Sequence, residues 1–355
     1  MEPSTTPIRS LAIRTSFRHH AEHAGYKQIL KYTNPVSILG IDENSALPGV
    51  LKRKYQWLYE FEAYFKFRNK IDVLHILYGE DYFRFSTCLF KNTPVVASFH
   101  QPPELLEREV LYGSFRGKVA RITHYMSYNR FKKLAAAIVM DEAQKDILKK
   151  MMSEEKIYVL PLGTNLRYLN AKLNTYSDLI NPDSKVILTV VNWLRDWDFY
   201  FHFISYCSVS YPDWKFILVN KNLSPAHRAL VQQNTNLTYA AKISDNELFK
   251  LYISSKVLFL PLLSAAGNNS LIEGIALGCP VVMSNVVNEK SFIDEDFVSF
   301  YTKNNVNEAT VAINGFMKMD RKSFIDVRKH AIDFSKQFDW ESIANKTLDI
   351  YRSVI

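Results

Sequence analysis

One polar stretch of the chain, SAAGNNSLIEGIALGCPVV (264–282), contains residue types that can bind an anion such as a phosphate. Ser270 and Glu273 have the spacing of a capping box, in which the serine begins a helix and the glutamate bonds back to the serine amide. Gly278 stands where a left-handed residue would end this short helix. Free amides at the start of such a helix favour phosphate groups.

Two interpretations of this stretch remain open on spacing alone. In the first, Ser270 and Glu273 only cap the helix, and Asn268 and Asn269 are ordinary turn residues; capping boxes are common, so spacing by itself favours this one. In the second, the loop holds a ligand. It directly follows the apolar run Val257–Leu263, and open α/β sheets bind ligands beyond the carboxyl ends of their strands.

Acidic and histidine clusters elsewhere are weak signals for a metal. Asp196 and Asp198 are spaced as D-x-D, as are Asp294 and Asp296, but the composition yields about one such pair by chance. Near the N-terminus, His19, His20 and His23 form a cluster, but no carboxylate stands at metal-ligand spacing from them. We expect these histidines in a loop and predict no metal site.

The elements that must position the polar loop are short apolar runs alternating with helix-length segments. Continuous Val/Ile/Leu runs are typical of parallel strands covered on both faces. The runs predict twelve strands, Leu11–Ser16, Ser37–Ile41, Val73–Tyr78, Val95–Phe99, Ala136–Met140, Tyr158–Leu162, Val186–Val191, Trp214–Asn220, Leu237–Ala241, Val257–Leu263, Val281–Ser284 and Phe297–Tyr301. Two sets of six indicate two doubly wound α/β domains.

The predicted domains are residues 1–170 and 183–336. Between them, Asn170–Lys185 is polar and aperiodic, with turn-forming Asn181-Pro182. Residues 337–355 contain a helical apolar stripe and are expected to cross back to the first domain. A chain of 355 residues is also long enough for two cores.

The net charge of +8 is carried by the first half of the chain. Residues 1–180 have 26 Lys+Arg and 18 Asp+Glu, whereas residues 181–355 have 18 of each. Leu51–Arg68 and Phe115–Lys133 interleave cations with aromatic residues, a pattern suited to an anionic membrane surface. The alternative is core aromatics with solvated cations. No RNA-binding signature is present, so nucleic acid is not an expected partner.

Composition and the chain's N-terminus indicate a cytoplasmic protein. The three cysteines are widely spaced, which argues against a disulfide framework. The first residues lack an apolar signal segment, and no apolar run approaches the ~18 residues that span a bilayer. We expect the protein either free in the cytoplasm or peripheral at the inner face of the membrane.

The second half resembles the nucleotide-sugar domain of GT-B glycosyltransferases, particularly glycosyltransferase family 4. The resemblance lies in KISDNELFKLYISSKVLFLPLL, NNSLIEGIALGCPVV and VILTVVNWLRDWDFYFHF. It implies two Rossmann-like domains facing a central cleft. It also implies that Arg195 meets the donor diphosphate, that Glu273 holds the ribose, and that the remaining donor contacts come from Ile243, Gly267, Asn268, Asn269, Ser270 and Leu271.

The first half resembles the acceptor domain of the same enzymes. HAEHAGYKQILKY is similar to the glycine loop and first helix that face the diphosphate, which implies donor contacts by Gly25 and Tyr26. PVVASFHQPPELL is similar to the strand and histidine at the reaction centre, which implies a catalytic set of His100, Arg195 and Glu273. As a departure, Ala265 stands where many members have a second glutamate.

The function implied is transfer of a sugar from a nucleotide-diphosphate sugar to a saccharide or lipid-linked saccharide, with retained configuration. The resemblance implies that the enzyme uses no metal and no cofactor. It also implies a role in cell-surface polysaccharide or glycolipid synthesis. Two other classes stay open: a catalytically degenerate GT-B partner protein and a nonhydrolysing sugar-nucleotide epimerase. A metal-dependent GT-A enzyme is disfavoured by the two sets of strands.

Overall fold

The structure is a computed structural model that describes residues 7–15, 25–41, 58–112, 129–190, 194–265, 267–286, 293 and 295–355. The chain forms two compact units, Met1–Gly163 with Trp340–Ile355, and Thr164–Asp339. Residues 164–170, which the sequence assigns to the first domain, belong to the second unit. The limits 1–170 and 183–336 stay predictions.

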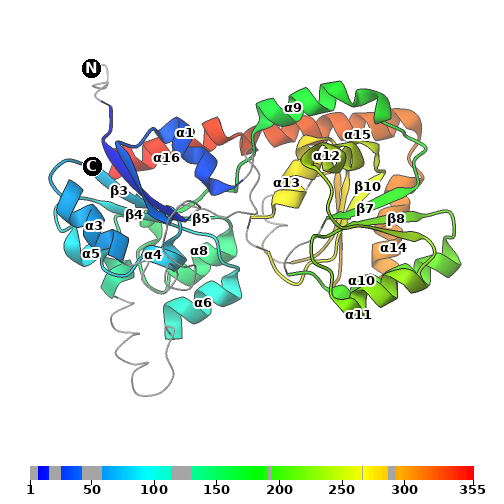
Figure 1. Cartoon of the computed structure of the whole chain (residues 1–355), viewed down its shortest axis with the longest axis horizontal. Helices are drawn as coiled ribbons and strands as arrows, with labels where there is room; N and C mark the ends of the chain where they lie inside the picture. The colour runs from blue at the N-terminus through cyan, green and yellow to red at the C-terminus, as the bar shows by residue number, and fades with distance from the viewer. Residues whose placement is uncertain are drawn as a thin grey trace. The chain divides into compact units, whose positions relative to one another are not determined.

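The first unit is built on a six-stranded, wholly parallel sheet (Figure 1). Its strands, in spatial order, are β2 (Ser37–Ile41), β1 (Ser10–Thr15), β3 (Val73–Ile76), β4 (Val95–Phe99), β5 (Ala136–Val139) and β6 (Ile157–Val159). Its helices are η1 (Tyr26–Ile29), α1 (Leu30–Thr33), α3 (Leu58–Phe67), α4 (Gly79–Tyr82), α5 (Ser86–Leu89), α6 (Pro103–Tyr112), α8 (Glu142–Leu148), η2 (Glu154–Lys156) and α16 (Trp340–Val354).

The second unit repeats this plan with its own six parallel strands. In spatial order they are β12 (Val298–Tyr301), β11 (Val281–Ser284), β10 (Val257–Leu260), β7 (Val186–Val190), β8 (Lys215–Val219) and β9 (Leu237–Ala240). Its helices are α9 (Leu166–Thr175), η3 (Ser177–Leu179), α10 (Trp197–Ser210), α11 (Pro225–Gln233), α12 (Asp245–Ser254), α13 (Asn269–Ala276), α14 (Val306–Met317), α15 (Arg321–Phe334) and η4 (Ser335–Phe338).

The twelve predicted strands are all present, and the α/β prediction of two doubly wound parallel sheets is confirmed. Several strands end earlier than predicted. The largest differences are at β6, which ends at Val159 instead of Leu162, and at β10, which ends at Leu260 instead of Leu263. Pro261 has no amide hydrogen to continue the ladder, and the Leu262 backbone bonds to the Ser284 hydroxyl instead. β10 and β11 are buried along their whole length, as continuous apolar runs in parallel sheets should be.

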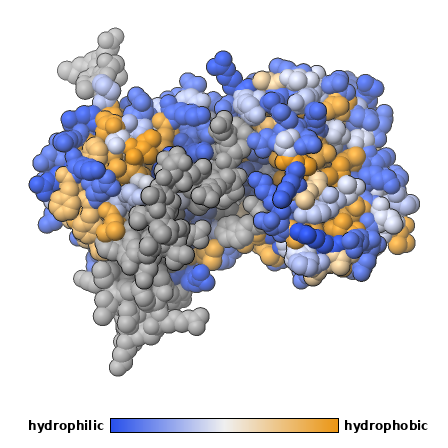
Figure 2. Space-filling view, in the orientation of Figure 1, coloured by the Kyte–Doolittle hydropathy of each residue, from blue (hydrophilic) through white to orange (hydrophobic). Residues whose placement is uncertain are grey.

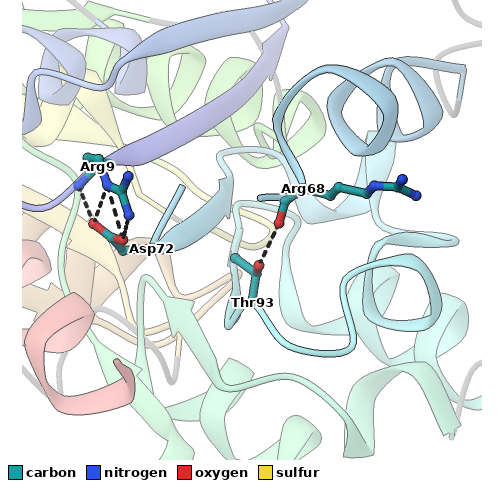
Figure 3. A network of polar contacts seen from close by, with 4 residues as sticks. All are labelled: Arg9, Arg68, Asp72 and Thr93. Atoms are coloured by element: carbon teal, nitrogen blue, oxygen red, sulfur yellow. Dashed lines mark hydrogen bonds and ion pairs between the residues drawn. The ribbon is translucent and has the colours of Figure 1, made fainter. Parts of the chain in front are cut away.

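At the amino edge of the first sheet, polar side chains hold the starts of two neighbouring strands (Figure 3). The Arg9 guanidinium donates to Asp72 at 2.6 Å, and the Arg9 amide donates to the same carboxylate at 2.9 Å. Arg9 precedes β1 and Asp72 precedes β3. Nearby, the Thr93 hydroxyl donates to the Arg68 carbonyl. These contacts lie at the edge opposite the carboxyl ends of the strands, so they serve the fold.

A buried carboxylate on α3 holds the start of α5. Glu60 is fully buried and accepts hydrogen bonds from the amides of Arg84, Phe85 and Ser86. The Ser86 hydroxyl donates to the same carboxylate. Because a buried carboxylate needs such partners, Glu60 ties together two helices that are about 25 residues apart in the chain.

The two basic segments are only partly described. Residues 51–57 and 115–128, with His19, His20 and His23, lie outside the described residues. On α3, Leu58 and Phe65 are 50% and 74% exposed, and Figure 2 shows hydrophobic residues on the surface there. By contrast, Arg130 donates to the Phe83 carbonyl at 2.6 Å, so this cation is held by the protein. Within the described ranges, no helix is both long and apolar enough to span a bilayer.

Candidate functional site

The second sheet has one point at which the strand order reverses. From β7 the chain proceeds to β8 and β9, then returns to place β10 on the other side of β7. Loops after β7 and β10 therefore diverge at the same edge, where open α/β sheets bind ligands. Arg195 follows β7, and the Gly267–Glu273 segment follows β10.

Backbone pairing fixes Arg195 against the end of β10. Arg195 and Leu262 form an antiparallel bridge. It is flanked by hydrogen bonds from the Asp196 amide to the Pro261 carbonyl at 2.9 Å and from the Leu263 amide to the Leu194 carbonyl at 3.0 Å. The Arg195 residue is 9% exposed, so it is largely buried at this position. A positive charge is thus held at the strand-order reversal.

Helix α13 begins two residues earlier than predicted, so the capping-box prediction is wrong. Its N-cap is Asn268, whose side-chain oxygen accepts from the Leu271 amide at 3.3 Å. Asparagine caps as well as serine, and here it takes the cap position from Ser270. Glu273 consequently lies inside the helix, 8% exposed, and the capping interpretation of this residue is lost.

Two glycines allow α13 its close packing. Gly278 has φ of 71° and ends the helix, as predicted. At Gly274, an added Cβ would lie 2.6 Å from Leu258 Cδ2 on β10. A side chain at position 274 would therefore force Leu258 to shift, and the glycine lets α13 pack closely on β10.

Tyr252 on α12 belongs to this site, although the sequence did not nominate it. Its pKa is raised well above the usual value, first by burial and then by the nearby Glu273 carboxylate, while Arg195 acts in the opposite direction. The Ser270 side chain has a smaller effect, which lowers this pKa. Tyr252 therefore keeps its proton. Because Glu273, Arg195 and Ser270 all affect its pKa, these three residues lie near Tyr252.

The start of α13 offers donors for an anion or a polar ligand. The amides of Asn269 and Ser270 are in the first turn, where no intrahelical acceptor exists. The Asn268 Nδ2 amide is buried and has no acceptor among the residues that the structure describes. Together with the Arg195 charge, these groups suit a phosphate, since a helix start and a cation attract the same ligand.

The other predicted residues of the second unit lie at varying distances along the same edge. Gly267 has φ of 64°, directly before the Asn268 cap, and Leu271 is buried in α13. Ile243 follows β9, and β9 is separated from β7 by β8. The structure brings Arg195 and α13 together and places Ile243 two strands away. Ala265 is buried beside the same loop.

The first sheet also reverses its order, between β1 and β3. After β1, Gly25 has φ of 87° and begins η1, so a left-handed position explains this glycine. Tyr26 follows and is buried, with its hydroxyl 3.0 Å from Ser98 Oγ. His100 comes directly after β4, and its ring centroid is 4.4 Å from that of Tyr26. The predicted residues of this unit are thus in contact.

A buried hydrogen-bond chain lies beneath these rings. His75 on β3 joins Ser98 Oγ at 2.7 Å through Nε2 and the Tyr351 hydroxyl at 2.6 Å through Nδ1. Burial, with a smaller effect of His100, lowers the pKa of His75 to about 3. A neutral His75 therefore connects α16 to Tyr26 through Ser98.

One described member of each acidic pair has another partner. Asp196 caps α10, and its side chain accepts from the Phe199 amide at 3.1 Å. Asp296 contacts His330 Nδ1 at 2.8 Å, and Asp294 lies outside the described residues. Among those residues, no three His, Cys, Asp or Glu side chains are grouped to hold a metal ion.

Solved structures share this fold over most of the chain. Sucrose-phosphate synthase from Thermosynechococcus elongatus is 16% identical, with 97% of this chain and 98% of that chain covered and a TM-score of 0.68. Anabaena HepE, solved with UDP and glucose, is 11% identical, with coverage of 98% and 100% and a TM-score of 0.65. A UDP-forming trehalose-phosphate synthase from Burkholderia xenovorans is 11% identical, with coverage of 84% and 79% and a TM-score of 0.61.

No protein-family model matches the chain, and no curated protein matches it in sequence. The structural matches define its class: the chain has the GT-B fold, the two-domain α/β architecture of these glycosyltransferases. This confirms the fold that the sequence resemblance implied. Membership of glycosyltransferase family 4, and the individual site residues, stay predictions.

Proposed function

We propose that the chain is a glycosyltransferase whose second unit binds a nucleotide-diphosphate sugar. The observation that carries this proposal is the juxtaposition of Arg195, the start of α13 and the buried Glu273 at the strand-order reversal. A cation and free amides suit a diphosphate, and a buried carboxylate suits the paired hydroxyls of a ribose. Structures with this fold have been solved with UDP and with UDP-glucose, which makes uridine nucleotides the first probes.

In the proposed reaction, the bond between the anomeric carbon and the diphosphate oxygen breaks. The electron pair leaves with the nucleoside diphosphate, and an acceptor hydroxyl oxygen forms the new bond while its proton passes to the departing phosphate. Attack on the face that the leaving group vacates retains the configuration. Arg195 and the α13 amides stabilise the charge that develops on the leaving group, usually the largest catalytic contribution in such sites. We propose that the transfer proceeds without a metal.

The first unit then binds the acceptor, a saccharide or lipid-linked saccharide, in cell-surface polysaccharide or glycolipid synthesis at the inner face of the membrane. An anionic membrane surface is the proposed partner of the basic first half. Its support is the exposed Leu58 and Phe65 on α3, with Lys66 on the same helix and Arg68 directly after its end. Salt-sensitive binding to vesicles containing anionic lipid tests it, and equal binding to neutral and anionic vesicles at low salt would end this part of the proposal.

The donor site is tested by calorimetry with UDP, GDP, ADP and their glucose conjugates on the wild type, Glu273→Gln and Arg195→Met. We expect one nucleotide family to bind and each variant to weaken that binding by at least about tenfold, or 1.4 kcal/mol. Glu247→Gln is the matched control for the glutamate, because Glu247 is exposed in the first turn of α12, where it accepts from the Ser244 amide. Arg321→Met, at the exposed start of α15, is the control for the arginine.

Some outcomes would overturn the assignment. If no nucleotide binds, or if Glu273→Gln binds as well as the wild type, the donor site is misassigned. Conversion of a sugar nucleotide to its epimer without any acceptor would favour the epimerase class instead. Stable binding with neither transfer nor hydrolysis would favour a partner protein.

A further inference from the structure

A carboxylate that the sequence did not nominate lies against His100. Glu80 is in α4, which follows β3, and His100 follows β4, the neighbouring strand. The distance between His100 Nδ1 and Glu80 Oε1 is 3.6 Å, and their side chains are only 14% and 10% exposed. Two neighbouring parallel strands thus deliver an imidazole and a carboxylate to one point of the carboxyl edge.

The His100 ring is held between two tyrosines. Its centroid is 4.4 Å from that of Tyr26 and 4.7 Å from that of Tyr78. Tyr26 is itself fixed, because its hydroxyl joins Ser98, which joins His75. The imidazole therefore has little freedom to rotate away from Glu80.

Three polar atoms of this pair are buried without a partner. Both ring nitrogens of His100 and the Glu80 Oε2 oxygen have no hydrogen-bond partner among the residues described in the structure. Leaving such atoms unsatisfied costs about 1–3 kcal/mol each, so buried polar atoms in this state point to a polar ligand or to a contact that tightens on binding. Functional hydrogen bonds are often long before the ligand arrives.

We propose that Glu80 is a positioning residue that holds His100 with its proton on Nδ1, so that Nε2 accepts a hydrogen bond from a hydroxyl group of the bound sugar. A histidine tautomer is set by the partner of the other nitrogen. A carboxylate only accepts, so it selects the Nδ1–H form. The Glu80 Oε2 oxygen is available to a second hydroxyl of the same ligand.

The neighbours of His100 favour the tautomer with the proton on Nδ1. The groups facing it are Glu80 from α4, Tyr78 from the segment before α4, Tyr26 from η1 and, electrostatically, His75 from β3. Of these, only Glu80 is an acceptor close to Nδ1. The identity of the ligand as a sugar rests on the proposed function, whereas the tautomer does not.

The test is nitrogen-15 NMR of histidine-labelled protein near pH 7.5, with the His100 signals assigned by their loss in His100→Gln. The expected wild-type spectrum shows His100 as the Nδ1–H tautomer, and Glu80→Gln shifts it toward the Nε2–H form. A wild-type His100 in the Nε2–H form would overturn the proposal without any variant. An unchanged tautomer in a folded Glu80→Gln would overturn it as well.

The proposed hydrogen bond from a sugar hydroxyl to His100 Nε2 is tested by adding methyl glycosides of glucose, galactose and mannose. We expect at least one to move the His100 Nε2 signal in the wild type, and its apparent affinity to fall about tenfold in Glu80→Gln, as for other supporting residues. Glu107→Gln is the control, because Glu107 pairs with Lys150 on the surface of the same unit. No response to any glycoside would overturn the sugar assignment.

The two proposals can fail separately. Titration of the same samples with UDP reports on the second unit. Glu80→Gln should leave the affinity for UDP unchanged. Failure of the wild type to bind UDP, GDP and ADP alike would sink the proposed function while leaving the His100 tautomer result intact. A normal UDP titration with the wrong tautomer would sink only the inference about Glu80.

Discussion

His75 should make the first unit sensitive to acid. The residue is buried between Ser98 and Tyr351, and its pKa is lowered from 6.5 to about 3. Because the unfolded chain takes up a proton near pH 6.5 and the folded chain does not, the unfolded state gains stability as the pH falls. The contribution of His75 is therefore complete at neutral pH and decreases between pH 6.5 and 3.

The size of the effect follows from these two values. A single group with these pKa values removes about 2 kcal/mol of unfolding free energy between pH 7 and pH 5. Asp141 acts in the opposite direction, because burial raises its pKa to about 6 and its folded form then holds a proton that the unfolded form releases. Only the difference between the wild type and a His75 variant isolates the histidine.

The assay is pulse proteolysis in urea, with peptides of the first unit identified by mass spectrometry. His75→Gln keeps polar groups near the two hydroxyls and removes the titration. We expect this variant to be less stable than the wild type at pH 7, and the gap to narrow by about 2 kcal/mol at pH 5. Parallel pH profiles for the two proteins would refute a neutral buried His75. Peptides of the second unit serve as the internal control.

Three further predictions concern other residues. Glu60→Gln should lose about 1–3 kcal/mol of stability, since a carboxamide cannot accept from all the amides that Glu60 holds; a neutral effect in urea unfolding would contradict this. Gly274→Ala should cost about 1–3 kcal/mol by overpacking against Leu258 and should weaken nucleotide binding; unchanged melting and binding would show that α13 can move freely. Chelation of divalent metals with EDTA should leave UDP affinity within about twofold, and abolished binding would place a metal at the Arg195 site.

The sequence was most informative about the strands. Runs such as Val281–Ser284 and Val95–Phe99 are continuous and apolar because both faces of a parallel strand are covered, so their limits agree with the structure. The end of β10 was less predictable. There, the Ser284 hydroxyl accepts a hydrogen bond from the Leu262 amide and donates one to the Leu262 carbonyl. No local sequence pattern reveals a hydrogen bond between residues 22 positions apart.

The sites were predicted less completely than the strands. Ser270 and Asn268 are equally suitable caps, so spacing alone could not select the start of α13. Glu80 and Tyr252 were missed because each meets its site only through tertiary packing from another element. Both residues lie in ordinary helical segments, and the sequence around each gives no sign of its tertiary contact.

The contact between α16 and the first sheet has a consequence for the order in which the protein is made. His75 and Tyr351 are separated by 276 positions, and every residue of the second unit is synthesised between them. On the ribosome, the second unit can complete its core while the first still lacks its last helix. Until Trp340 and Tyr351 emerge, the first unit lacks the contact of Gly163 with Trp340 and the bond that links His75 and Ser98 to Tyr351. The half of the molecule that is translated first is therefore finished last, and it is the half that needs protection from aggregation during synthesis.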